Sequence, residues 1–366
     1  MVAYLIVFFL CLILSQLSTN KRKTPVILSC LLLSLLAGFR DVTVGSDTDF
    51  YPHFYISELP NIKSFANIVF LDTILDKGFL FLYWFGSWFG NQYWIGLFLV
   101  EFVVTLFTFG AYFRLSRHFG RSIFIFTFAF LFLIYNYTLN AMRQECAISI
   151  AFLAFSYLIE KRWVLFFIWT GVAYTFHSSS IVTLIFPVML YISNIEDKRK
   201  RNLFISLILC AGVFVFSSLF SLVHLVGELG LLNADHINAY ASGEKFEAAD
   251  RVAYVPLLIS IIIYFFIYLA YKRNILDKKF VVFHLLMNTF YLFSLFLSLV
   301  SIYLYRVGLF FYIVDIYMLS VIVSSKKINF LMRTFVVIIF VLYWAYLYVI
   351  QNNSETVPYT SRILGI

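Results

Sequence analysis

Apolar segments long enough to cross a membrane recur along almost the whole of this chain, and short basic loops separate them. A helix needs roughly 20 apolar residues to cross the hydrocarbon of a bilayer, and somewhat shorter segments also span it. The residues are 62% hydrophobic and only 13% charged, with a mean hydropathy of +0.91, and these values exclude a soluble domain. We therefore expect an all-α, polytopic integral membrane helix bundle.

The apolar pattern predicts about 12 transmembrane helices, arranged as a single transmembrane domain that covers residues 1–366. They are expected at 2–18, 25–39, 92–113, 121–139, 143–159, 163–177, 178–193, 202–224, 252–271, 280–301, 303–323 and 331–350. The segment 78–90 is shorter and is interrupted by glycine, so we expect it to be re-entrant or interfacial.

The positions of lysine and arginine predict the orientation, because basic residues accumulate in cytoplasmic loops. With both termini on the outer side, every inner loop is basic, and these loops hold most of the 27 Lys and Arg residues. The formal net charge of +8 then reflects membrane anchoring, and no nucleic-acid partner is expected. The basic cluster 21–23 follows the first apolar segment, so that segment is expected to be a retained helix rather than a cleaved signal peptide.

Two outer loops are long, at about 40–77 and 225–250, and the first begins with several groups that suit an anionic ligand. Arg40 offers a guanidinium for charge-assisted bonds to phosphate, and Asp41, Tyr51 and His53 follow closely. Asp47 and Asp49 also form a D-x-D pattern, which suits a divalent cation but is short enough to arise by chance. The alternative for this loop is an ordinary membrane anchor followed by a polar turn.

Four further basic residues stand at predicted outer helix ends, where the charge distribution disfavours them: Arg143, His177, Arg251 and Arg306. Each has a purely structural alternative except Arg306, whose nearest deeper acid, Asp315, is nine residues away and too far for a helical pair. Arg143 has Glu145 nearby, His177 precedes a run of serines that suits a helix cap, and Arg251 follows acidic neighbours. Together these residues predict a surface for an anionic group on the outer face.

Two other ionisable residues within apolar segments carry weaker signals. Glu101 lies inside the third predicted helix and is a candidate proton-relay carboxylate. His284 stands singly in the sequence, and we assign it no role.

An ordered set of short motifs spans nearly the full length of the chain. The set comprises Gly38-Phe39-Arg40, Gly45-x-Asp47-x-x-x-Tyr51, Asp76-Lys77-Gly78-Phe79, Arg143 at a helix start, Phe176-His177-x-Ser179, Arg306, and Val357-Pro358-Tyr359. In these motifs the chain resembles the EpsG/Wzy-type bacterial polysaccharide polymerases, in which the acid near Asp76 is usually a glutamate. The resemblance implies a GT-C-like enzyme of the bacterial inner membrane, multi-pass, with both termini periplasmic.

The resemblance further implies an enzyme that joins oligosaccharide repeat units carried on undecaprenyl pyrophosphate, for O-antigen, capsule or exopolysaccharide. We expect Arg40, Arg143 and Arg306 to hold the pyrophosphate, and Arg251, Tyr51 and His53 to bind substrate as well. His177 is the first candidate for the base that deprotonates the acceptor hydroxyl, with Asp41 and Asp47 as alternatives. No metal or cofactor is expected. The resemblance implies as partners the lipid-linked oligosaccharides, membrane lipid, and a chain-length regulator and flippase of the same pathway.

Two other functions fit the same class of protein. A flippase or transporter of lipid-linked oligosaccharide also has about 12 helices, but its two related halves would place charges near mid-membrane. An O-antigen ligase or another outer-face glycosyltransferase shares the same chemistry and the same face of the membrane.

Overall fold

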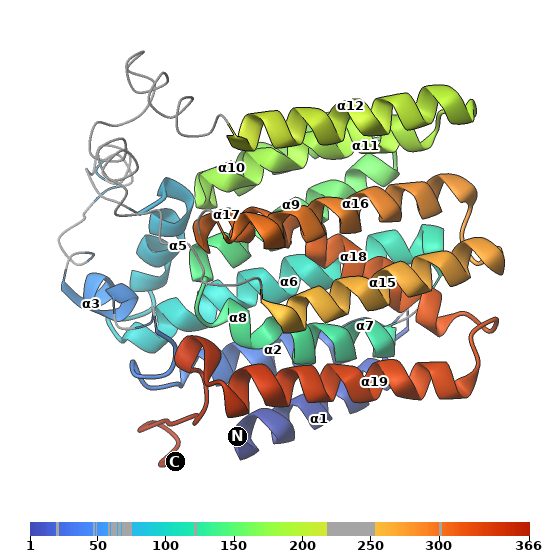
Figure 1. Ribbon diagram of the computed structural model, residues 1–366. Coiled ribbons are helices and arrows are strands. Elements are labelled where there is room, and N and C mark those ends of the chain that lie inside the picture. Colours follow the sequence, from blue (N-terminus) through green and yellow to red (C-terminus); the bar gives the residue numbers. More distant parts are fainter. Residues whose placement is uncertain are drawn as a thin grey trace. The chain divides into compact units, whose positions relative to one another are not determined.

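The structure, a computed structural model, describes residues 1–19, 22–46, 48, 50–57, 59, 64, 67, 75–120, 123–217, 253–299 and 302–366. Every regular element in these ranges is helical (Figure 1). The all-helical expectation is therefore confirmed for the part of the chain that is described. The GT-C-like topology stays a prediction.

Within the described ranges, six helical segments are long and apolar enough to cross a membrane. They are α6 (Tyr93–Phe119), α9 (Met142–Ile159), α15 (Tyr254–Lys272), α16 (Lys278–Leu297), the segment Tyr305–Ser324 that contains α18 (Leu309–Ser324), and the segment Phe330–Ile350 formed by α19 (Phe330–Trp344) and η4 (Ala345–Ile350). Five shorter apolar helical segments accompany them: α1 (Val2–Leu17), α2 (Thr24–Gly38), Ile123–Thr138, α10 (Trp163–Phe176) and Ser178–Ser193. The chain is thus a multi-pass membrane protein, and the count of twelve crossings stays a prediction.

Local sequence accounts for several helix boundaries. Pro25 stands in the first turn of α2, where the absent N–H costs no helical hydrogen bond. Gly120 ends α6 with a φ of +86°, a backbone conformation that glycine adopts without strain. The segment 78–90, expected to be re-entrant or interfacial, forms the short helix α5 (Lys77–Ser87), which packs against α6 and α10.

The chain divides into two compact units, which are described separately. Unit 1 comprises Met1–Thr183 and Ile316–Ile366. Within it α9 packs against both α6 and α10, while α2 packs against α1 and α6. Aromatic rings fill its interior, where Tyr317 meets the rings of Tyr112, Phe126 and Phe152. The helices α6 and α9 therefore lie at the centre of this packing, because α6 contacts α2, α3, α5 and α9.

Both chain termini lie at one end of unit 1 (Figure 1). The hydroxyl of Tyr4, near the start of α1, donates to the carbonyl of Thr356 at 2.8 Å. Trp344 Nε1 donates to Asn136 Oδ1 at 2.7 Å, and Asn136 Nδ2 donates in turn to Thr356 Oγ1 at 3.0 Å. The C-terminal segment 353–366 is therefore tied into the interior of unit 1 by buried hydrogen bonds.

Unit 2 comprises Leu184–Asp315 and contains α11 (Ile185–Ser193), α12 (Lys198–Ser217), α15, α16 and α17 (Ile302–Val307). In this unit α16 packs against α11, α15 and α17. His284 on α16 is fully buried, and its Nε2 lies 3.2 Å from Oδ1 of Asp315. His284 stands singly in the sequence, and helix packing brings Asp315 of α18 close to it.

Candidate functional site

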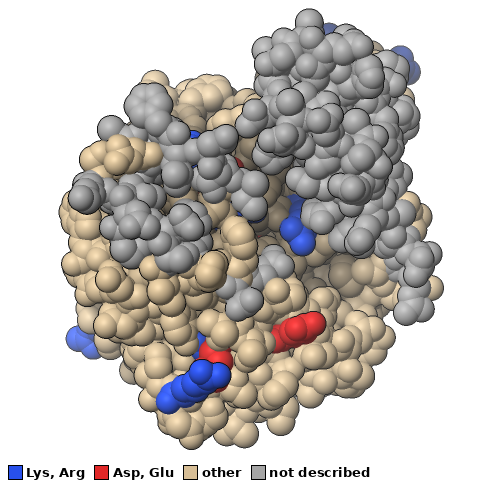
Figure 2. All heavy atoms as spheres, turned by 90° about the vertical axis from the view of Figure 1, so that its left-hand side faces the viewer, with Lys and Arg blue, Asp and Glu red and all other residues tan. Residues whose placement is uncertain are grey.

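The candidate site lies at the end of unit 1 that holds both termini. Figure 2 shows this side of the molecule, where most of the described surface carries neither Lys, Arg, Asp nor Glu. Charged groups that do occur here are therefore exceptional. Arg143 stands in the first turn of α9, a candidate membrane-spanning helix. A cation at such a depth needs a partner or a ligand.

Arg143 forms a cluster with Asp76 and Tyr51. Its NH1 atom lies 3.0 Å from Asp76 Oδ2, and its Nε donates to the Tyr51 hydroxyl at 3.2 Å. The arginine and aspartate side chains are 28% and 25% exposed. The alternative pairing of Arg143 with Glu145 is not the one that the structure shows, because Asp76 provides the carboxylate. A guanidinium held by an acid and a phenol at a partly open surface is positioned for a second anion.

Three separate elements position this cluster. Arg143 is on α9, Asp76 directly precedes α5, and Tyr51 belongs to α3 (Phe50–Ser57). The Tyr51 ring packs on Phe79 of α5 with centroids 5.2 Å apart, and Phe79 packs on Tyr83 at 4.5 Å. Because these rings are buried, they fix α3 against α5 and hold the phenol at the guanidinium.

Gly78 allows the start of α5 to approach the end of α10 closely. A Cβ atom at Gly78 would lie 2.5 Å from Thr175 Oγ1 and 2.9 Å from a ring carbon of Phe176. No side chain fits at that distance. The approach brings the Asp76-Lys77-Gly78 and Phe176-His177 motifs together, although almost a hundred residues separate them in the sequence.

His177 caps the C-terminal end of α10 and is partly exposed. Its Nδ1 lies 2.6 Å from Ser179 Oγ and 3.3 Å from the Ser179 backbone nitrogen. The serine thus orients the imidazole ring at the end of α10. A histidine held through one ring nitrogen is suited to exchange a proton at the other.

Arg40 occupies a different environment from Arg143, because it is only 1% exposed. Its guanidinium donates to the carbonyl of Ala37 at 2.9 Å and to the carbonyl of Leu139 at 2.8 Å, and it approaches Thr48 Oγ1 at 3.5 Å. In this structure Arg40 therefore ties the end of α2 to the turn that precedes α9. That turn leads directly into Arg143.

Asp41 and the turn that follows it bind the C-terminal segment. Asp41 Oδ1 accepts a bond from the Arg362 backbone N–H at 3.0 Å, and the Asp41 N–H donates to Thr360 at 3.0 Å. The N–H of Gly45, which has a φ of +102°, donates to Glu355 at 2.9 Å. Residues from both ends of the chain thus form one hydrogen-bonded layer over the end of α2.

The Val357-Pro358-Tyr359 motif contributes to this layer. The Tyr359 hydroxyl donates to the carbonyl of Leu36 at 2.8 Å. Burial raises the pKa of Tyr359 to about 12, so the hydroxyl keeps its proton, and can donate this bond, even at moderately alkaline pH.

The remaining predicted site residues are distributed as follows. His53 is on α3 with an exposed side chain. Arg306 is in the last turn of α17 in unit 2 and is partly exposed. Asp47 and Arg251 lie outside the described residues, as does Asp49 of the D-x-D pattern. Glu101 is buried in α6, where its Oε2 accepts a bond from Thr138 Oγ1 at 2.8 Å.

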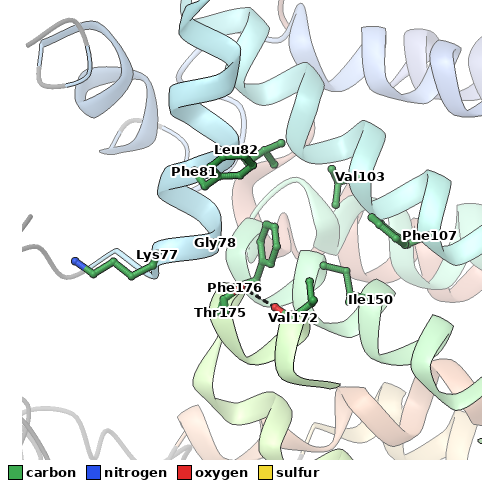
Figure 3. A pocket seen from close by; sticks show the side chains of 10 residues that line it. All are labelled: Lys77, Gly78, Phe81, Leu82, Val103, Phe107, Ile150, Val172, Thr175 and Phe176. Carbon is green, nitrogen blue, oxygen red and sulfur yellow. Dashed lines mark hydrogen bonds between the residues drawn. The ribbon is translucent and has the colours of Figure 1, made fainter. Parts of the chain in front are cut away.

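An apolar cavity of about 410 Å³ lies beside the cluster, between α5, α6, α9 and α10 (Figure 3). Its lining consists of Lys77, Gly78, Phe81, Leu82, Val103, Phe107, Ile150, Val172, Thr175 and Phe176. The Thr175 hydroxyl donates to the Val172 carbonyl at 2.7 Å, so the interior is almost wholly hydrocarbon. In Figure 3 the Lys77 side chain extends away from the apolar side chains, so its ammonium group points out of the cavity.

Sequence reasoning did not identify the role of Asp76. The residue was recognised within a motif, yet its pairing with Arg143 was not predicted. A signal did exist, because a lone arginine at a helix start on the predicted outer face is unusual and needs an acidic partner or a ligand.

Comparison with known proteins supplies a family. A family model described as the EpsG family matches residues 23–361, which is nearly the whole chain. The match extends from the start of α2 to the C-terminal layer and includes the whole Arg143 cluster. No curated protein and no solved structure matches the chain.

Proposed function

This chain belongs to the EpsG family, a Wzy-type family of polysaccharide polymerases, and from that premise we propose that it joins oligosaccharide repeat units carried on undecaprenyl pyrophosphate. The reaction takes place at the end of unit 1 that carries Arg143, on the periplasmic face of the bacterial inner membrane. The observation that carries this proposal is the cluster in which Asp76 and Tyr51 hold Arg143 at the start of a membrane-spanning helix.

Arg143 binds the pyrophosphate that leaves in the reaction. The attacking sugar hydroxyl forms a bond to the anomeric carbon, and the bond from that carbon to the pyrophosphate oxygen breaks. Negative charge then grows on the departing lipid pyrophosphate. A preorganised guanidinium stabilises such charge more than it stabilises the bound substrate, which is the requirement for lowering a barrier. Asp76 acts through Arg143, because its carboxylate fixes the orientation of the guanidinium group.

His177 accepts the proton of the attacking hydroxyl. Its place at the end of α10, beside the start of α5, puts it close in the fold to the element that carries Asp76. An imidazole has a pKa near neutrality in its ordinary state and so serves as a base at physiological pH. Asp41 and Asp47 are the alternative bases, and an unaffected His177→Gln variant would favour them.

Arg40 takes a positioning role in this proposal. Its bonds to Ala37 and Leu139 hold the turn that leads into Arg143, and its burial separates it from a ligand at the surface. The substrate-binding roles expected for Arg306, Arg251 and His53 stay predictions from the sequence.

The test is a gel of surface polysaccharide from a strain that lacks this gene, with the gene restored in several forms. We expect a single repeat unit in the deletion strain and a ladder of polymer after rescue with the wild-type gene. Arg143→Ala should fail to restore the ladder. Arg143→Lys should restore little of it, because an ammonium group lacks the planar guanidinium geometry that binds a phosphate through two N–H groups. Membrane insertion of each variant is checked by immunoblotting.

Two results would count against the proposal. A full ladder from Arg143→Ala would show that the cluster does not bind the leaving group. Loss of even the single repeat unit in the deletion strain, with lipid-linked precursor trapped inside the cell, would indicate a flippase.

A further inference from the structure

We propose that the apolar cavity between α5, α6, α9 and α10 receives the polyprenyl chain of the lipid-linked substrate. This inference rests on the proposed function, because it takes the pyrophosphate to be bound at Arg143. It adds a second part to the site, a groove for hydrocarbon, and assigns that groove to one kind of lipid.

The register of α9 relates the cavity to the cluster. Ile150, which lines the cavity, is seven residues after Arg143 and so lies on the same face of the helix, two turns deeper. Seven residues correspond to about 10 Å along a helix. A ligand with an anionic head at Arg143 and a hydrocarbon tail therefore meets the cavity at the depth where its tail begins.

The polarity of the lining fits this kind of ligand. Phe107, Val172 and Phe176 form apolar walls, and α5 begins directly after the Asp76 that holds Arg143. The Arg143 guanidinium at the start of α9 and the hydrocarbon lining deeper along the same helix complement the charge pattern of a prenyl phosphate. Both α6 and α9 are candidate membrane spans, so the hydrocarbon part is at membrane depth.

The exposure of the lining residues indicates where a polyprenyl chain enters the cavity. Phe81 is 44% exposed, whereas Leu82 is 9% exposed and Ile150 is 1% exposed. The cavity therefore runs from the outer surface of unit 1 toward its interior. Its volume of about 410 Å³ is within the range of roughly 300–1,000 Å³ that is usual for small-molecule sites, so it holds part of one chain. The rest of a polyprenyl chain would lie in the bilayer.

Photocrosslinking of the purified full-length protein in phosphatidylcholine nanodiscs tests the proposal. The probe is a polyprenyl monophosphate that carries a diazirine in its chain, and labelled peptides are mapped by mass spectrometry. We expect labels on α5 and α10 that unlabelled polyprenyl diphosphate displaces and that an equal amount of phosphatidic acid leaves in place. This arm needs no variant, so it does not depend on the folding of a mutant.

A matched pair of variants adds a second arm. Val103→Trp fills the cavity from α6, whereas Leu106→Trp places the same ring at a position of the same helix that is 41% exposed. Val103→Trp should reduce labelling by about tenfold, since losing contact with even a few methylene groups weakens binding by that factor. Leu106→Trp should leave labelling and polymer length unchanged. Elution on size exclusion confirms that both variants are folded.

Several results would overturn the proposal: absence of label on α5 and α10, equal displacement by phosphatidic acid, or full polymer from a folded Val103→Trp variant. The polymer gel separates this failure from failure of the proposed function. If the wild type makes polymer but the cavity is not labelled, the cavity does not bind the polyprenyl chain, and the polymerase function still stands. If polyprenyl diphosphate displaces the label but the protein restores no polymer, the cavity binds the polyprenyl chain, and the polymerase function is refuted.

Discussion

Asp76→Asn is the substitution that most directly tests how the Arg143 cluster works. Asparagine keeps the size and shape of the side chain but removes the negative charge that faces the guanidinium. If Asp76 acts only by holding Arg143, the variant should retain a weakened activity with the same product. Replacing Arg143 itself should have a much larger effect.

The geometry gives the expected magnitude. The two charged groups are 3.0 Å apart and their side chains are 28% and 25% exposed, so the pair is neither buried nor fully solvated. A hydrogen bond to a charged group contributes about 1.5–3 kcal/mol, and an exposed ion pair about 0.2–1 kcal/mol. A value between these, about 1–2 kcal/mol, corresponds to a loss of about 5- to 30-fold in rate.

The assay is polymer formation by purified variants in bilayers that contain the lipid-linked repeat unit. Glu160→Gln is the matched control. It breaks the ion pair between Glu160 and Arg114 of α6, which lies at the end of α9 opposite Arg143. It should lower thermal stability by a similar amount and leave the rate unchanged. In the Arg143→Ala background, Asp76→Asn should cause no further loss, because two residues that act as one unit are not additive.

The reasoning would be refuted by either of two outcomes. Equal rates for Asp76→Asn and Glu160→Gln would mean that the loss reflects stability alone. A further drop when Asp76→Asn is added to Arg143→Ala would mean that the carboxylate has a role of its own in the reaction.

Three predictions concern helix packing, each measured as thermal unfolding in detergent. Gly78→Ala should separate α5 from α10 and lower the unfolding temperature, and Thr175→Ala in the same chain should recover part of the loss by removing the clashing Oγ1. Asn136→Ala should destabilise unit 1 by about 1–3 kcal/mol, because a buried indole N–H loses its acceptor. His284→Leu should destabilise the chain by leaving Asp315 buried without its partner, and Asp315→Leu added to it should restore stability; additive losses would contradict the pairing.

Most helix positions could be predicted from local sequence, and the reason is the solvent. In a bilayer each spanning segment satisfies its own backbone hydrogen bonds, so an apolar segment of sufficient length forms a helix irrespective of its neighbours. The expected segment 143–159 corresponds to α9 at Met142–Ile159, and 331–350 corresponds to Phe330–Ile350. Larger differences occur at helix ends: α6, expected at 92–113, continues to Phe119 through a basic last turn, and α12 begins at Lys198 rather than 202.

The candidate site was predictable in part. Arg143 was identified because a cation at an outer helix start is rare, and that rule needs no knowledge of the fold. The environment of Arg40 was not predictable by the same rule, since the sequence does not show whether a guanidinium faces solvent or the carbonyls of Ala37 and Leu139. Exposure depends on neighbouring helices, and these come from distant parts of the chain.

Sequence alone determined that this is a helical multi-pass membrane protein with unusual cations at helix ends, because hydropathy and charge act locally along the chain. Only the tertiary structure decided which groups meet. Asp76 and Arg143 are 67 residues apart. Asp41 accepts a hydrogen bond from the backbone N–H of Arg362, which is 321 residues away. Such pairs form because side-chain packing brings particular helix ends together, as Gly78 does for α5 and α10. The physical cause is close contact between surfaces, which no single segment encodes by itself.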